Sequence, residues 1–101
     1  MKLVGWGRII NMGAQAAAKG MPLAGPYCTS KIAIHALTKI IALENGGNIT
    51  CNALVPGIID TPSNRKQMPG ANHGNWVGSG KIAKKIEGLL LSDENGALIS
   101  L

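Results

Sequence analysis

The chain has 101 residues, a length that accommodates one domain with a modest core. Hydrophobic residues make up 46% and charged residues 15%, a composition that describes a globular chain and excludes intrinsic disorder. The net charge of +5 is compatible with a nucleic acid partner. However, only Lys81, Lys84 and Lys85 cluster, and no aromatic residues lie among them to stack on bases. We therefore expect these lysines to form a solvated helix face, and nucleic acid binding is the least favoured function.

The first predicted element is a short strand over residues 7–12, GRIINM, where an apolar run opens with glycine. The following GAQAAAKGMPLAGP is predicted to be a loop, because glycine and proline interrupt it. A helix is predicted from Pro26 to residue 44, since proline suits the first helical turn and Asn45-Gly46-Gly47 favours termination. Its broad apolar face consists of Ile32, Ala33, Ala36, Leu37, Ile40, Ile41 and Leu43.

The second half of the chain is predicted to begin with a central parallel strand over residues 48–55, NITCNALV, which is nearly all apolar. After Pro56 and Gly57 we expect a loop of roughly two dozen residues, a length typical of functional or mobile loops. A helix over residues 80–92 with Ser79 as its N-cap, and a last strand in GALISL, complete the chain. The apolar face of that helix would consist of Ile82, Ile86, Leu89 and Leu90.

This order of elements, β-α-β-α-β, predicts the α/β class with three parallel strands joined by right-handed crossover helices. The segment GSGK at residues 78–81 suggests a phosphate-binding loop, but the motif fails at two positions. Asn75 stands where its first glycine is required, and Ile82 stands where it needs serine or threonine.

The two cysteines, Cys28 and Cys51, have no C-x-x-C or metal-site spacing, so we expect buried free thiols in a reducing compartment. His35 and His73 have no supporting ligand set, and no metal site is predicted. The amino terminus lacks the apolar stretch of a signal peptide, and no run approaches the roughly 20 residues that span a bilayer. We expect a cytoplasmic location and no membrane partner.

The candidate chemistry lies in Tyr27 and Lys31, which stand four residues apart on the first predicted helix and so share one face. A nearby ammonium group stabilises the ionised phenol, which makes tyrosine a better proton exchanger near neutral pH. On this pair alone, the simpler interpretation is that Tyr27 is an ordinary tyrosine at the start of a helix and Lys31 a solvated lysine. His35, one turn further on, could be a relay, but a helix-packing or interface role is favoured.

Three segments in this order, GRIINMGA, YCTSKIAI and ITCNALVPGIIDTP, resemble the C-terminal half of a short-chain dehydrogenase/reductase. The resemblance covers almost the whole chain, which we treat as a single domain over residues 1–101, and LLSDENGALI is similar to the family's last helix and strand. The loop DTPSNRKQMP followed by Trp76 is closest to the dihydropteridine reductase-like group. The resemblance implies a three-layer, partial Rossmann-like fold without the N-terminal dinucleotide half.

By this resemblance Tyr27 is the catalytic acid/base, and Lys31 binds the nicotinamide ribose of NAD or NADP. Both residues would then contact the cofactor. The resemblance further implies that Pro56 and Gly57 end a strand at the ligand-binding edge of the sheet. The backbone of Ile59 and the hydroxyl of Thr61 would face the nicotinamide carboxamide and the phosphates.

Some of these residues have a simpler interpretation as well. On the residues alone, a turn after a strand is the favoured interpretation of Pro56, Gly57 and Thr61. Arg65, in the loop expected to close over substrate, could bind an anionic substrate or remain a solvated loop arginine.

Two departures from the family pattern affect the predicted function. By the resemblance, Ala14 falls near the place of the family's usual catalytic serine, which members of the dihydropteridine reductase-like group also lack. The chain also has no G-x-G-x-x-G followed by an acidic residue, so the usual pyrophosphate cradle is missing. We expect a truncated reductase that is inactive alone, or a non-catalytic oligomerising module derived from one. An unpaired strand edge near Ile9 and Ile10 would favour a homo-oligomer or a complementary chain supplying the N-terminal half.

Overall fold

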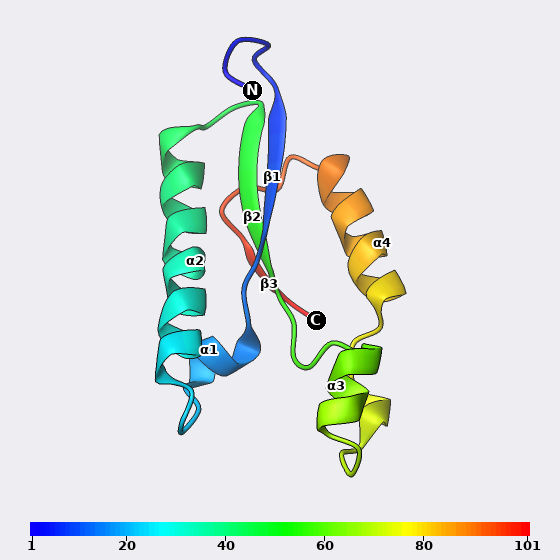
Figure 1. Ribbon diagram of the computed structural model, residues 1–101. Coiled ribbons are helices and arrows are strands. Elements are labelled where there is room, and N and C mark those ends of the chain that lie inside the picture. The colour runs from blue at the N-terminus through cyan, green and yellow to red at the C-terminus, as the bar shows by residue number, and fades with distance from the viewer.

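The computed structural model describes residues 1–101 and contains one sheet of three parallel strands in the order β1-β2-β3. The predicted α/β class and strand count are confirmed (Figure 1). The strands are β1 (Gly7–Met12), β2 (Ile49–Val55) and β3 (Leu98–Ser100). The helices are α1 (Gln15–Lys19), α2 (Gly25–Glu44), α3 (Pro62–Gln67) and α4 (Ser79–Leu90), with a 3-10 turn, η1 (His73–Asn75).

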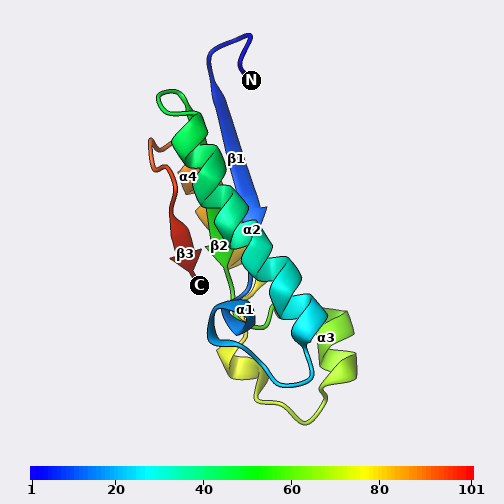
Figure 2. The same ribbon diagram turned by 90° about the vertical axis from the view of Figure 1, so that its left-hand side faces the viewer.

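The two long helices cover opposite faces of the sheet, which gives three layers. In Figure 2, α2 lies in front of the sheet and α4 behind it, while the strands point downward and follow in the order β1, β2, β3 from right to left. The β1-α2-β2 connection is therefore right-handed, as predicted, but the β2-α4-β3 connection is left-handed. The prediction was wrong there because α3 and η1 carry the chain around the end of the sheet before α4 begins.

The core is centred on β2, which pairs with β1 in the register Ile9 with Cys51 and with β3 through Ala53, Leu54 and Val55. Cys51, Ala53 and Leu54 are fully buried, as the prediction of a central parallel strand requires. Burial raises the pKa of the Cys51 thiol, which stays protonated and free. Cys28 is only half-buried, so the expectation of two buried thiols holds for Cys51 alone.

The buried residues of α2 are not the ones that its apolar pattern indicates. His35, Thr38 and Ala42 face the sheet and are buried. Of the predicted apolar face, only Ile41 is half-buried, and the side chains that remain exposed are Ile32, Ala33, Ala36, Leu37, Ile40 and Leu43. An apolar helix face left open to solvent is typical of an interaction surface.

Two asparagine side chains hold the last strand against β2. Asn52 Nδ2 donates to the Glu94 carbonyl at 2.8 Å, and Asn52 Oδ1 accepts from the Ala97 N–H at 3.0 Å. Asn95 Oδ1 accepts from the Cys51 N–H at 2.9 Å. These buried amide bonds explain why polar residues stand in and beside an apolar strand.

Three other predictions need correction. Short helices occupy both predicted loops: α1 follows β1, and α3 and η1 follow β2. The side chains of Thr61 and Asn72 cap α3 and η1, whereas α1 begins without a side-chain cap. The N-cap of α4 is Gly78 and not Ser79.

None of the helices combines the length and hydrophobicity that crossing a bilayer requires.

Candidate active site

A half-open cleft of about 1020 Å³ lies at the carboxyl ends of β1 and β2. Its walls come from the backbone after β1, the start of α2, the turn after β2, and α3. Parallel α/β sheets bind ligands at this edge, where loops leave neighbouring strands. The cleft brings together five of the six residues predicted for the site, namely Tyr27, Lys31, Pro56, Gly57 and Ile59.

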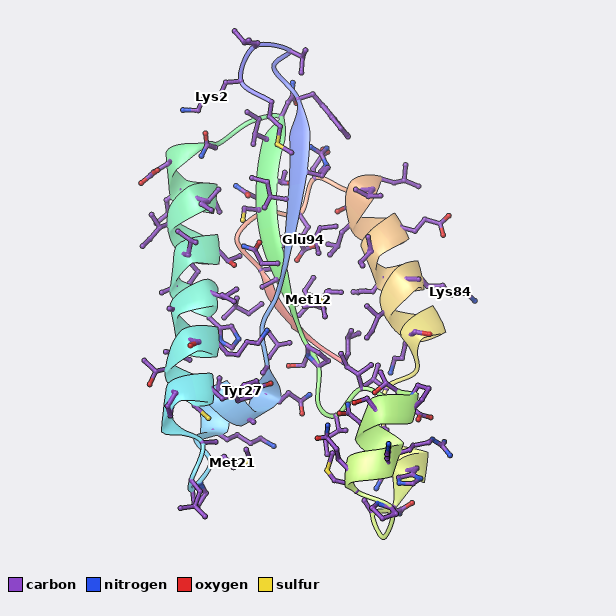
Figure 3. All side chains as sticks on the ribbon, viewed as in Figure 1. Lys2, Met12, Met21, Tyr27, Lys84 and Glu94 are labelled. Atoms are coloured by element: carbon purple, nitrogen blue, oxygen red, sulfur yellow. The ribbon has the colours of Figure 1, made fainter.

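Tyr27 is the third residue of α2 and lines the cleft with 48% of its surface exposed. Pro26 precedes it in the first helical turn, where proline's missing N–H leaves no helical bond unmade. Figure 3 shows Tyr27 at the start of α2, between Met12 and Met21. The phenol is therefore accessible to a ligand in the cleft and is held by a regular helix rather than a loop.

Lys31 lies one turn after Tyr27 on the same helix and also lines the cleft. Its Nζ donates a hydrogen bond to the Met12 carbonyl at 3.2 Å, which ties the ammonium group to the end of β1. One of its three N–H donors is thus used by the protein, and the others can serve a ligand. The pair combines a proton donor with a fixed positive charge.

Pro56, Gly57 and Ile59 form the opposite wall, directly after β2. Gly57 is exposed, and a Cβ atom at this position would lie 3.3 Å from Gln15 Oε1. Glycine therefore leaves room here for a close approach to the backbone. Asn64 Nδ2 donates to the Ile59 carbonyl at 2.8 Å, which fixes that wall to α3.

Thr61 is the one predicted site residue that does not line the cleft. Its Oγ1 accepts a hydrogen bond from the Asn64 N–H at 3.1 Å, so it is the N-cap of α3. The hydroxyl thus has a structural role in the free chain. Its contact with a cofactor stays a prediction.

An ion pair stabilises the segment that enters α3. Arg65 donates two hydrogen bonds to the Asp60 carboxylate, at 2.6 and 2.9 Å. The hydrogen bonds from Arg65 lower the pKa of Asp60 below its usual value. Arg65 is therefore paired with Asp60 while its side chain remains 52% exposed, and its binding of an anionic substrate stays a prediction.

Sequence reasoning did not identify Gln15, which follows Ala14 and lines the cleft. Its Nε2 donates to the Leu101 carbonyl at 3.1 Å, and its backbone N–H donates to the Pro56 carbonyl at 3.0 Å. Gln15 thus links the ends of all three strands. The available signal was its position beside Ala14, but no local pattern marks a residue that bridges distant segments.

In GSGK, residues 78–81, Gly78 is the N-cap of α4 and Gly80 lies in its first turn, and neither glycine lines the cleft. With Ala83, the segment also fits the looser pattern G-x-G-x-x-A. The residue before it, Val77, forms only an isolated bridge with Ile59. The strand-to-helix turn of a dinucleotide site is therefore not formed there.

The parallel sheet covered by helices on both faces, with a cleft at its carboxyl edge, defines a protein of the Rossmann-like α/β class. The model of the short chain dehydrogenase family matches residues 1–72. The chain belongs to that family, and the resemblance predicted from the three sequence segments is confirmed.

Individual relatives agree with this assignment. A D-beta-hydroxybutyrate dehydrogenase from Rhizobium meliloti (strain 1021) is 40% identical over 70 residues, covering 68% of this chain and 27% of the relative. A dihydropteridine reductase from Dictyostelium discoideum is 35% identical over 83 residues, covering 79% of this chain and 36% of the relative. The solved structure "ElxO with NADP Bound" gives a TM-score of 0.85 at 27% identity, covering 99% of this chain and 46% of that one. The chain thus spans between 27% and 46% of the length of these relatives.

Proposed function

We propose that the chain is the substrate- and nicotinamide-facing part of an NAD(P)H-dependent oxidoreductase. The observation that carries this proposal is the convergence of Tyr27 and Lys31 on a cleft at the carboxyl ends of β1 and β2. The family membership supports the reaction class.

The residues of the cleft fit one end of a nicotinamide dinucleotide. Lys31 retains N–H donors for the ribose hydroxyls, and Gly57 leaves its backbone open beside Ile59 for the nicotinamide carboxamide. No glycine-rich strand-to-helix turn is available in this chain for the pyrophosphate, so tight binding requires a second polypeptide segment. ElxO, a structural neighbour, is described with NADP bound.

When bound, the cofactor supplies the hydride. Tyr27 would donate its phenolic proton to the group being reduced, and Lys31 would stabilise the phenolate that remains. The rim of the cleft includes Met21 and Leu23, both strongly exposed apolar residues. Such a rim favours an organic substrate with an apolar portion.

The missing segment would pair with two open surfaces. β1 is an edge strand of the sheet, and α2 leaves Ile32, Leu37 and Ile40 between 44% and 50% exposed. An unpaired edge and an open apolar face both favour association with a second copy or a complementary chain. With two free cysteines, this assembly would be cytoplasmic.

The test is calorimetric titration of NADH and NADPH into the isolated chain and into any complex that co-purifies with it. We expect one site per complex and weak or no binding by the isolated chain. Absence of binding in both samples would refute the proposal.

A second candidate function is a non-catalytic interaction module, which the exposed face of α2 favours. Analytical ultracentrifugation tests this function, because the module must associate in order to act. A monomer at all concentrations, without a co-purifying partner, would exclude it.

A further inference from the structure

The side chain of His35 is a buried polar group that the proposed chemistry does not use. It lies on α2, one turn after Lys31, and is only 4% exposed. Its Nε2 accepts a hydrogen bond from the Ala14 N–H at 3.1 Å. A backbone N–H can only donate, so Nε2 carries a lone pair and the ring is neutral, with its proton on Nδ1.

Gly13 makes this contact possible. A Cβ atom at Gly13 would collide with Nε2 and Cδ2 of the His35 ring. The φ angle of Gly13 is not positive, so space and not backbone conformation requires glycine here. Gly13 and His35 therefore form one packed unit between the end of β1 and the middle of α2.

The same short segment is tied down on both sides. Towards α2, the Met12 carbonyl accepts from Lys31 Nζ at 3.2 Å and the Ala14 N–H donates to His35. Towards β2, the Gly13 N–H donates to the Leu54 carbonyl at 2.8 Å. The Met12 carbonyl that accepts from Lys31 is thus two residues away from the Ala14 N–H that donates to His35.

We infer that His35 is a positioning residue: its neutral ring fixes the Met12–Ala14 backbone, which in turn fixes Lys31 beside Tyr27. This inference rests on the proposed function for its catalytic meaning. Ala14 has no hydroxyl to contact a ligand, and what remains at this position is a backbone whose placement depends on His35.

The two histidines of the chain provide an internal control, because the structure requires opposite tautomers. His73 Nε2 lies 3.0 Å from the Met68 carbonyl, an acceptor only, so its proton belongs on Nε2. Nitrogen-15 spectra of the cofactor-free chain should show unprotonated Nε2 in His35 and protonated Nε2 in His73. A protonated Nε2 in His35 would overturn the inference.

Variants test the positioning step without any cofactor. His35→Leu should speed hydrogen exchange at the Ala14 amide at least about tenfold and shift the ring signals of Tyr27, the only tyrosine. His35→Gln keeps an acceptor near Nε2 and should restore both readouts, while the control His73→Leu should change neither. Unchanged Ala14 exchange and Tyr27 signals in His35→Leu would refute the inference. If His35→Leu does not fold, His35→Gln provides the test. Shifted Tyr27 signals in His35→Gln, with the exchange of the Ala14 amide unchanged, would refute the inference.

Failure of this inference and failure of the proposed function are distinguishable. If NADPH does not bind any sample, the proposed function fails while the tautomer and exchange results still stand. If a complex is active, His35→Leu should lower kcat in the folded complex, and His35→Gln should recover it. Full kcat in folded His35→Leu would overturn the inference and leave the proposed function intact.

Discussion

Placing a methyl group at position 13 tests the close packing between β1 and α2. The Cβ atom in Gly13→Ala would occupy the space of the buried His35 ring, which cannot swing into solvent. Overpacking of this kind costs about 1–3 kcal/mol of unfolding free energy. Alanine also restricts the unfolded chain and returns about 0.4–1 kcal/mol, because the φ angle at position 13 suits it. The expected net loss is roughly 0–2.6 kcal/mol.

A double-mutant cycle isolates the collision from the unfolded-state effect. In the His35→Ala background, Gly13→Ala should be neutral or stabilising by up to about 1 kcal/mol, because the ring is gone. The coupling energy should therefore be about 1–3 kcal/mol. Urea unfolding of the four proteins, at one protomer concentration, measures it. An equal cost of Gly13→Ala in both backgrounds would show that the two residues do not pack as described.

Three further predictions concern the cleft and α3. Thr61→Ala should destabilise the chain by about 1 kcal/mol through loss of the N-cap, whereas Thr61→Ser should not, as urea unfolding would show. Hydrogen bonds from Arg65 lower the folded-state pKa of Asp60, so this pair stabilises the fold above the unfolded pKa of about 3.9 and the stabilisation is lost as pH falls through the lowered value. Arg65→Gln should move the carbon-13 titration midpoint of Asp60 upward, and an unchanged midpoint would contradict the pairing. In an active complex, Tyr27→Phe should lower kcat by about 10²–10⁴ with NADPH affinity nearly unchanged, and retained turnover would exclude Tyr27 as the proton donor.

Much of the fold follows from local sequence signals. The strand over residues 7–12 is confirmed, and the other strands and long helices lie within a few residues of their predicted positions, because apolar runs and Gly/Pro boundaries are local. The handedness of the second connection was mispredicted, since it depends on the path of α3 and η1 around the sheet. The apolar face of α2 was predicted from the spacing of its residues, but spacing does not show whether another segment covers that face, and in this structure most of it is exposed.

The site shows the same division between local and distant information. The spacing of Tyr27 and Lys31 places them on one face of a helix, so their proximity was predictable. The helix-packing role predicted for His35 is confirmed by its burial. Its hydrogen bond to Ala14 and the contacts of Gln15 were not predictable, because each joins segments far apart in sequence. Thr61 precedes Pro62 in a capping pattern that could have been recognised from the sequence.

The proposed function requires Lys31 and Tyr27 to face a nicotinamide once a dinucleotide-binding half is present. Its most direct test is calorimetric titration of NADPH into this chain mixed with the glycine-rich half of a family member. We predict one site per complex, lost in Lys31→Ala and retained in Lys39→Ala, which removes an exposed lysine from the same helix. No binding by the mixture, or equal binding by both variants, would contradict the account.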